Sequence, residues 1–418
     1  MQQEFVISSL GVVSPSGIGK EAFWKSLENG ISAISNIESF STDKFSVKLG
    51  GEIKNFDPKV FLGQKGLRNL DRSSLFLMTA AHLALSDARL EITESNTDDI
   101  GVVTGTTFPH LWSMIEFDRE VLKEGLDFSN PALFPSTVLN AASSQVSIRF
   151  NIQGFNASLT TGYTSGLEAL KYSLMALETG KAKTVLCGAV ESLALSLFFG
   201  FYKLNYMAGI NGQALSCPFD KRRNGPLLSE AAAVFSVERA EEAKMRQADI
   251  LAKIRSVVCY FDGFKIAKIH PEGEGLEKAI VKALDEAGVA TNDIDYISSC
   301  ANSSLEVDKT EVKVLKKIFG DSLSKIPVSS IKSMVGETLS ASAALQIASC
   351  VGVMKTDIIP PTINYKGKDP ECDIDCVPNK AQKKDVKLAL VVSFGPGGYN
   401  SACVLERYDV RHQPSAIS

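Results

Sequence analysis

The sequence predicts an α/β fold built from two similar halves that pack together. Short apolar segments typical of buried strands alternate with amphipathic segments typical of helices along the chain. The composition also resets at Ile250, after which the plan of strand, helix, strand, turn and helix recurs. We therefore expect an N-terminal half at residues 1–250, a C-terminal half at residues 251–412 and a frayed tail at residues 413–418.

Composition and charge restrict the class of protein. The chain has 418 residues, of which 44% are hydrophobic and 22% are charged, and its formal net charge is -4. This composition is ordinary for a globular protein, and the lack of a strong basic block argues against a nucleic-acid partner. The chain has no apolar run long enough to span a bilayer and no signal-peptide pattern, so we expect a cytoplasmic protein.

Cysteine and histidine spacing argues against metal and redox chemistry. The eight cysteines form no CxxC pair, and no two of the four histidines have the spacing of metal ligands. We expect most of the cysteines to be reduced and buried, and we expect neither a metal site nor a cofactor.

Each half is predicted element by element. In the first half we expect strands at residues 5–13, 100–105, 183–191 and 234–237, helices through residues 23–27, 75–87 and 238–247, and an irregular or hairpin insertion at residues 30–65. In the second half we expect helices at residues 276–287 and 309–319 and strands at residues 294–299 and 388–394. Asp71 and Ser73 are candidate caps for the helix at 75–87.

Aromatic residues gather in two places. Apolar side chains recur at helical spacing between Phe108 and Phe117, and Phe134 introduces an alanine-rich helix. A second group of aromatic residues lies between Phe198 and Tyr206. Core packing is the default interpretation of both groups, and an apolar ligand tunnel is the alternative.

A strand, a glycine-bounded turn and a helix follow one another between residues 158 and 180. Ser158 to Thr161 is β-prone, a Gly-Tyr-Thr-Ser-Gly turn follows, and leucines then recur at helical spacing from Leu167 to Leu177. This arrangement places the central side chain of the turn at a helix N-terminus, where the helix dipole stabilises an anion. Enzymes use such an elbow to present a nucleophilic serine or cysteine, whereas this chain presents Tyr163.

Four further stretches complete a pattern that resembles a known family. They are PFDKRRNG at 218–225, SSIKSMVG at 329–336, IPPTIN at 359–364 and SFGPGGYN at 393–400. In this order and spacing, from Val6 to about Glu406, the chain resembles the elongating β-ketoacyl-acyl-carrier-protein synthases. The resemblance implies the thiolase fold, a five-layer α-β-α-β-α sandwich of two duplicated halves that works as a dimer.

The catalytic positions of that family are substituted. The family's elbow carries a cysteine that accepts the acyl chain, and two histidines stabilise the oxyanion of decarboxylation and condensation. The match places Tyr163 at the cysteine, Cys300 at the first histidine and Glu337 at the second. A phenol is mostly protonated at neutral pH, and a carboxylate repels a developing oxyanion, so we expect no intact catalytic residue.

Several supporting positions are retained. Lys332, Asp308 and Glu311 match the family, whereas Pro396 replaces a gating phenylalanine. The resemblance indicates Phe108, Leu111, Trp112, Ile115, Phe134, Phe201 and Pro396 as tunnel or gating residues. Lys65, Arg68 and Arg72 lie where the family can contact the carrier protein, and a solvated positive face is the alternative.

The resemblance implies a chain-length factor, the degenerate subunit that forms a heterodimer with an active ketosynthase in type II polyketide or polyene synthesis. Such a subunit works with an acyl carrier protein and helps to bound the tunnel for the acyl or polyketide chain. Chain-length factors usually carry glutamine at the elbow, and we expect Tyr163 to plug the vestigial pocket instead. Two alternatives stay open: an enzyme with rebuilt acyl-transfer or hydrolytic chemistry that uses Cys300 and Glu337, and a homodimeric acyl-binding protein.

Overall fold

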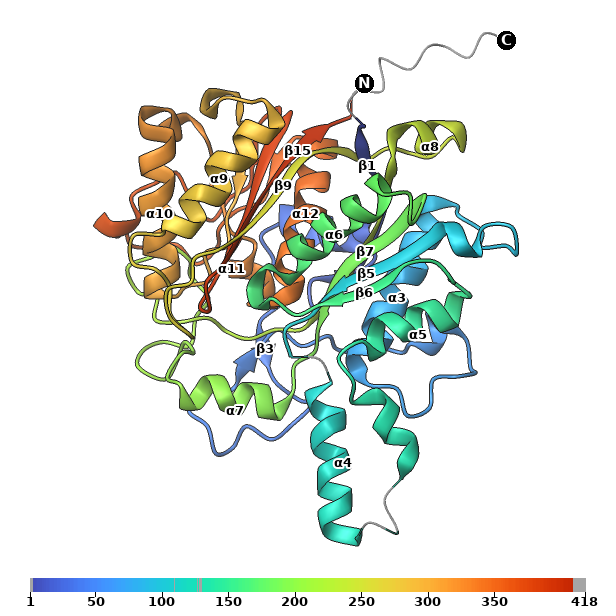
Figure 1. Ribbon diagram of the computed structural model, residues 1–418. Coiled ribbons are helices and arrows are strands. Elements are labelled where there is room, and N and C mark those ends of the chain that lie inside the picture. Colours follow the sequence, from blue (N-terminus) through green and yellow to red (C-terminus); the bar gives the residue numbers. More distant parts are fainter. Residues whose placement is uncertain (1–2, 109, 126, 128–129, 409–418) are drawn as a thin grey trace.

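The computed structural model describes residues 3–108, 110–125, 127 and 130–408, so the predicted tail at 413–418 lies outside the described residues. Its main feature is an 11-stranded sheet (Figure 1). The first half contributes β1 (Phe5–Ser14), β2 (Gly17–Ile18), β5 (Ile100–Gly105), β6 (Asn156–Leu159), β7 (Thr184–Glu191) and β8 (Ala231–Arg239). The second half contributes β9 (Ala252–Phe261), β10 (Tyr296–Ser298), β11 (Val328–Ser329), β14 (Leu388–Phe394) and β15 (Tyr399–Arg407).

The sheet repeats one strand order. The strands lie in the order β11-β10-β14-β15-β9-β1-β8-β7-β5-β6, and β2 pairs only with β1. When the strands on this path are numbered within each half, both halves have the order 3-2-4-5-1. The two first strands, β1 and β9, pair antiparallel and join the halves. The predicted duplication is therefore confirmed by the topology, and the division at residue 250 stays our proposal.

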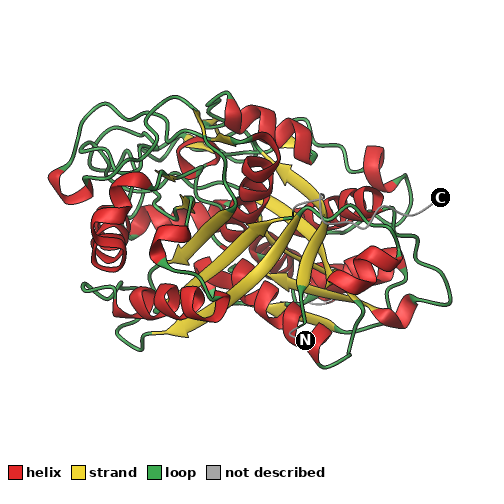
Figure 2. Ribbon diagram, turned by 90° about the horizontal axis from the view of Figure 1, so that it is seen from above, coloured by secondary structure: helices red, strands yellow, loops and turns green. Residues whose placement is uncertain are grey.

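Helices lie on both faces of each half-sheet, which gives five layers (Figures 1 and 2). α3 (Arg72–Ala88) and α5 (Ala141–Phe150) cover one outer face, and α9 (Glu274–Ala287) and α10 (Leu305–Phe319) cover the other. α6 (Ser165–Glu178) and α12 (Ser340–Thr356) lie between the half-sheets and share one apolar core with strands of both. This confirms the predicted α-β-α-β-α sandwich.

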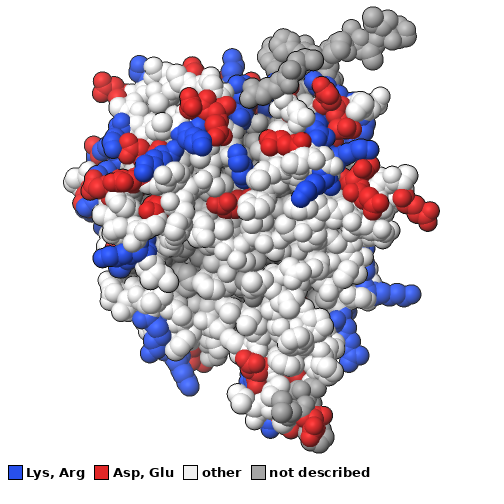
Figure 3. Space-filling view, viewed as in Figure 1, with Lys and Arg blue, Asp and Glu red and all other residues white. Residues whose placement is uncertain are grey.

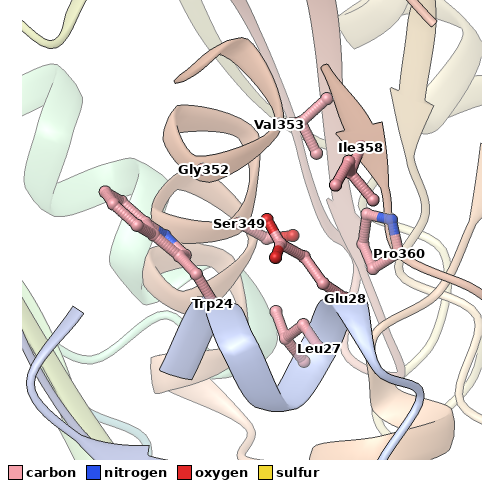
Figure 4. Close-up of a pocket in the computed structure, with 8 residues that line it drawn as sticks. All are labelled: Trp24, Leu27, Glu28, Ser349, Gly352, Val353, Ile358 and Pro360. Atoms are coloured by element: carbon pink, nitrogen blue, oxygen red, sulfur yellow. The ribbon is translucent and has the colours of Figure 1, made fainter. Parts of the chain in front are cut away.

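The central helix α12 was not predicted, because its sequence has no amphipathic period. Every residue from Ser340 to Met354 is buried, so no polar face marks the helix. α1 (Lys20–Glu28) packs on α12, where the Trp24 indole Nε1 donates to the Ala348 carbonyl at 2.8 Å (Figure 4). The cavity of about 10 Å³ beside Trp24 has room for little more than one water molecule, so it is no ligand site.

The first aromatic segment forms a projection rather than core. α4 (Leu111–Glu124) extends from the body of the protein, and η3 (Pro131–Ser136) lies against it (Figure 1). Ser113 is the only buried residue of α4, while Trp112 is 51% exposed and Phe134 is 58% exposed. The default prediction that this stripe is core is therefore wrong for Trp112 and Ile115, which no layer of the described chain covers.

The second aromatic segment is α7 (Leu195–Lys203), which buries Leu197 and Phe198. The insertion at 30–65 contains the short hairpin β3 (Ser35–Asn36) and β4 (Leu49–Gly50) and the turn of helix α2 (Lys59–Leu62), as predicted. The remaining short elements are α8 (Ala240–Met245), η1 (Thr97–Asp99), η5 (Thr291–Asp293), η6 (Gly320–Lys325), α11 (Lys332–Val335), β12 (Ile358–Ile359), η7 (Pro370–Cys372) and β13 (Gln382–Lys383). Within the described part of the chain, no helix has the length and apolar character to cross a membrane.

Candidate functional site

The predicted elbow is present at the N-terminus of the central helix α6. β6 ends at Leu159, the single turn η4 (Gly162–Thr164) follows, and α6 begins at Ser165. Gly162 adopts a φ of 66°, which favours glycine. Its carbonyl accepts hydrogen bonds from Thr107 Oγ1 at 3.1 Å and from Ser165 Oγ at 2.8 Å, so the turn is tied to the end of β5. The sequence therefore located this architecture correctly.

The side chain that the elbow presents is buried and neutral. Tyr163 is 8% exposed, and its ring packs so closely on Gly395 that a Cβ there would lie 2.5 Å from Tyr163 Cδ2. Lys332 Nζ lies 5.9 Å from the centre of the ring. Burial raises the pKa of Tyr163 well above its usual value, and the neighbouring Tyr206 and Glu337 add to this effect. The phenol is thus held protonated, which makes it a poor nucleophile.

Glu337 and Lys332 form a buried ion pair. Lys332 Nζ and Asn302 Nδ2 both donate to Glu337 Oε2 at 2.8 Å. The Leu339 nitrogen and Ser342 Oγ both donate to Glu337 Oε1 at 2.8 Å. Each carboxylate oxygen already accepts two hydrogen bonds, so Glu337 is fully engaged within the protein. Leu339 directly precedes α12 and Ser342 lies in its first turn, so Glu337 also holds the start of that helix in place.

Cys300 is paired with a carboxyl group in the interior. Its Sγ donates to Glu311 Oε2 at 3.5 Å, and its nitrogen donates to Glu311 Oε1 at 3.2 Å. Ser299 Oγ donates to the same carboxyl at 2.7 Å. Burial raises the pKa of the Cys300 thiol well above its usual value, and Glu311 adds to the effect. A buried, protonated thiol is inert as a nucleophile.

Asp308 holds two loops together. It accepts hydrogen bonds from the nitrogens of Phe219 and Asn302 at 2.8 and 2.9 Å. Burial raises its pKa to about 6, and the nearby Arg223 guanidinium opposes that rise. The 218–225 loop and the chain after Cys300 are therefore fixed to α10, which is a structural role.

Some of the predicted tunnel residues lie beside the elbow, and others are exposed on α4 and η3. Leu111 and Phe201 pack in the same apolar cluster as Tyr163, and the Phe108 and Phe201 ring centres are 6.4 Å apart. Farther out, the Phe117 and Phe134 rings lie 5.7 Å apart. Trp112 and Ile115 are exposed on α4, and Pro396 follows Gly395 in the loop beside Tyr163. Whether these residues bound a tunnel stays a prediction.

The three predicted carrier-protein residues differ in availability. Lys65 and Arg68 are exposed. Arg72 instead donates to Glu230 from Nε at 2.9 Å and from Nη2 at 2.6 Å, and its guanidinium lies 4.7 Å from the centre of the Phe76 ring. Arg72 is 35% exposed but is paired with the buried Glu230, whereas Lys65 and Arg68 are available to an acidic partner.

Sequence reasoning missed three polar residues that form hydrogen bonds at this site. Asn302 and Ser342 donate to Glu337 from segments with no recognisable motif. Glu191, at the end of β7, accepts hydrogen bonds from the nitrogens of Thr107 and Phe108 at 3.0 and 3.1 Å. Burial raises the pKa of Glu191 to about 7. Its position at the end of a parallel strand was the available signal.

Comparison with known families decides the relationship. Residues 2–243 match the family described as "Beta-ketoacyl synthase, N-terminal domain", and residues 251–366 match "Beta-ketoacyl synthase, C-terminal domain". The chain belongs to the β-ketoacyl synthase family. Members of this family are β-ketoacyl-acyl-carrier-protein synthases, which are transferases, so the resemblance seen in the sequence is confirmed.

Curated β-ketoacyl synthases resemble this chain over nearly its whole length. It is 34% identical to the 3-oxoacyl-[acyl-carrier-protein] synthase 2 of Coxiella burnetii over 410 residues, which cover 97% of this chain and 99% of that one. It is 32% identical to the Synechocystis sp. protein of the same name, again over 97% of this chain and 99% of that one.

Similar solved structures include a ketosynthase/chain length factor and a type II polyketide ketosynthase. A chain of "The ishigamide ketosynthase/chain length factor" superposes with a TM-score of 0.91 at 27% identity, covering 98% of this chain and 100% of that one. A chain of "AntDE:AntF (apo): type II PKS acyl-carrier protein in complex with its ketosynthase bound to the hexaketide" superposes with a TM-score of 0.89, with the same identity and coverage. This chain is therefore related both to fatty-acid synthases and to type II polyketide ketosynthases with their chain-length factors.

Proposed function

We propose that this chain is a non-catalytic subunit of the chain-length-factor type. It forms a heterodimer with an active ketosynthase, takes part in elongating acyl or polyketide (including polyene) chains bound to an acyl carrier protein, and shapes the product tunnel. The observation that carries the proposal is the buried Lys332–Glu337 pair, in which Glu337 stands at an oxyanion-stabilising position with both its oxygens engaged.

The chemistry of condensation needs groups that this site lacks. A condensing enzyme needs a thiolate that accepts the acyl group and neutral donors aimed at the oxyanion. Here the elbow holds a protonated phenol, and an engaged carboxylate occupies one histidine position. At the other histidine position, the thiol of Cys300 donates to Glu311 and is not aimed at an acyl group. The chain therefore needs a partner for catalysis.

The outer surface near the elbow supports pairing. The middle of the face in Figure 3, over α6, β6 and α5, carries few charged side chains. The large exposed apolar side chains on α4, η3, α5, α6 and the segment between η3 and α5 are Trp112, Met114, Ile115, Leu122, Phe134, Val138, Leu139, Ile148, Tyr172 and Met175. An exposed apolar surface of this kind is typical of a protein–protein interface. The chain "The ishigamide ketosynthase/chain length factor" is similar over nearly the whole length of this one.

The alternative with rebuilt chemistry has little support from the geometry. Cys300 is 1% exposed and protonated, and Glu337 is bonded to Lys332 rather than to Cys300. A hydrolase or acyltransferase needs an accessible nucleophile next to its base. A homodimeric acyl-binding protein needs the same apolar face, and the experiment below separates it from the heterodimer.

The test is co-expression with a ketosynthase that has the intact Cys-His-His set, together with an acyl carrier protein. We expect a stable 1:1 heterodimer, with condensation by the pair and none by this chain alone. The Tyr163→Cys variant alone stays inactive, because Glu337 still occupies a histidine position. The proposal fails if this chain purifies only as a homodimer and an acyl-thioester probe labels Cys300.

A further inference from the structure

A buried polar cluster lies at the base of α4, outside the site described above. Its members are Asp71, Ser73, His110 and Ser113, none of them more than 2% exposed. Asp71 Oδ1 accepts from the Ser73 nitrogen at 2.9 Å and from Ser73 Oγ at 2.7 Å, and Oδ2 accepts from Ser113 Oγ at 2.7 Å. His110 Nδ1 lies 3.2 Å from Ser73 Oγ and 3.6 Å from Asp71 Oδ1.

The cluster links two elements that are distant in sequence. Asp71 caps α3, whereas His110 occupies the N-cap position of α4 without a side-chain capping bond and Ser113 lies in the first turn of α4. Because the Ser73 hydroxyl donates to Asp71, it accepts from the Nδ1–H of His110. Although burial opposes ionisation, the contacts with His110, Ser73 and Ser113 lower the pKa of Asp71 to about 2, so the acceptor of this network is charged.

α4 has few other contacts that set its direction. Ser113 is its only buried residue, and α4 packs mainly on η3 and α7. His110 adopts a left-handed φ of 58°, a conformation that a residue with a Cβ keeps only where its surroundings demand it. Within the described residues, His110 Nε2 has no partner, so the ring is held through Nδ1 alone.

We propose that Asp71, Ser73, His110 and Ser113 form a clamp that fixes the direction of α4 and thereby positions its apolar face for the partner subunit. The fixed direction of α4 is a property of the isolated chain. The positioning of α4 for the partner subunit rests on the proposed pairing function.

The chain contains its own probe for the clamp. It has two tryptophans, of which Trp112 lies in the first turn of α4 and Trp24 is buried against α12. In a Trp24→Phe background, the decay of Trp112 fluorescence anisotropy reports the motion of α4. A dilution series distinguishes this motion from the effect of self-association on the decay. We expect Ser113→Ala to at least double the amplitude of the nanosecond decay, and Ser113→Thr, which keeps the hydroxyl, to restore the original value.

Two further variants sharpen the test. Asp71→Asn can still cap α3 but cannot hold Ser113 by a charged acceptor, so it should loosen α4 while the melting temperature shows a folded protein. Arg119→Ala removes only an exposed ion pair with Glu116 farther along α4 and should leave the decay unchanged. Unchanged anisotropy in both folded Ser113→Ala and Asp71→Asn overturns the clamp, and so does an equal effect of Arg119→Ala.

The effect of the clamp on binding of the partner subunit is measured separately. With the co-expressed ketosynthase, Ser113→Ala should raise the Kd of the heterodimer at least tenfold, and Ser113→Thr should not. A mobile α4 with an unchanged Kd overturns the proposal that the clamp positions α4 for the partner. If no heterodimer forms even with the unsubstituted chain, the pairing function fails, and the proposed positioning of α4 for the partner fails with it. The Trp112 measurement still decides whether the clamp exists.

Discussion

At the scale of single residues, Glu337 determines how the site is stabilised. Its carboxylate compensates the buried Lys332 ammonium and accepts three further hydrogen bonds. An ion pair of this kind adds little compared with an apolar replacement of both partners, but the loss of one partner strands the other charge in the interior. Each member of the pair is therefore needed for stability, because without it the other member would be buried without a partner.

Substitution of Glu337 tests this dependence. We expect Glu337→Gln to lower the free energy of unfolding by about 3 kcal/mol, because it leaves the amino group of Lys332 buried without a counter-ion. Urea unfolding followed by circular dichroism measures the change. The matched control is Glu371→Gln in the exposed Lys309–Glu371 pair, for which we expect less than about 1 kcal/mol. Equal losses in the two variants would contradict the prediction.

The carboxyl group beside Cys300 predicts a pH dependence. Burial raises the pKa of Glu311 from 4.5 to about 7, so the folded state holds this proton more tightly than the unfolded state. The resulting stability is fully present below pH 4.5 and is lost as the pH rises through 7. Glu311→Gln removes the titration, so the stability of the native chain relative to this variant should fall by up to about 3 kcal/mol between pH 5 and pH 8. Parallel pH profiles from urea unfolding would show that Glu311 is not responsible.

At the scale of elements, α4 differs from every other long helix. The helices of the sandwich bury an apolar face against a half-sheet, whereas α4 leaves Trp112 and Ile115 in solvent. A helix with such a face is stabilised by packing against a partner rather than by its own sequence. This exposed apolar face fits the interface that we propose with a partner subunit.

Charge placed on α4 should separate pairing from folding. We expect Trp112→Glu and Ile115→Lys to change the free energy of unfolding of the isolated chain by no more than about 0.5 kcal/mol, as is usual at exposed positions. Both should abolish the heterodimer in light scattering after gel filtration, since each places a charge in an apolar interface. Arg119→Ala on the same helix should leave the heterodimer intact. An intact heterodimer in both charged variants would mean that α4 is not at the interface.

At the scale of the whole molecule, the two halves depend on one another. α6 belongs to the first half and α12 to the second, and both lie in one core between the half-sheets. Gly166 of α6 approaches Ser340 so closely that an added Cβ would lie 3.0 Å from its carbonyl oxygen. Each half alone would expose the apolar face of its central helix and of its half-sheet.

Division of the chain at residue 250 tests this interdependence. We expect residues 1–250 and 251–418 to be aggregated or molten when each is expressed alone, and to co-purify with native circular dichroism when they are expressed together. A half that folds cooperatively alone would show that the central layer is not shared in the way described.

Much of the sandwich was predictable from sequence, for reasons that particular elements show. The strand at 388–394 was predicted at its observed bounds because its apolar run is short and its flanks are polar. The elbow was located because a glycine-bounded turn is local. α12 and strand β15 were missed: α12 lacks a polar face, and β15 lacks a distinctive pattern beside its glycine-rich turn.

The resemblance to the family predicts that catalytic positions are substituted, but it could not predict the hydrogen-bond partners of the side chains at these positions. Asn302 and Ser342 reach Glu337 across 35 and 5 residues, and only the fold brings these groups together. The clamp at Asp71 was seen only as a helix cap, since its link to Ser113 spans 42 residues. The exposure of α4 was misjudged because the sequence of one chain does not show which surface a second chain covers.

The double role of Glu337 bears on how this lineage can change. The same side chain balances a buried lysine and holds the start of the central helix α12, and the proposed function also assigns it to the position of a catalytic histidine. A histidine introduced at this position alone would weaken the fold, because Lys332 would lose its partner. It would restore no turnover, because Tyr163 would still fill the elbow. Under the proposed function, a single substitution at this position therefore costs stability without returning activity, so selection for stability favours keeping Glu337.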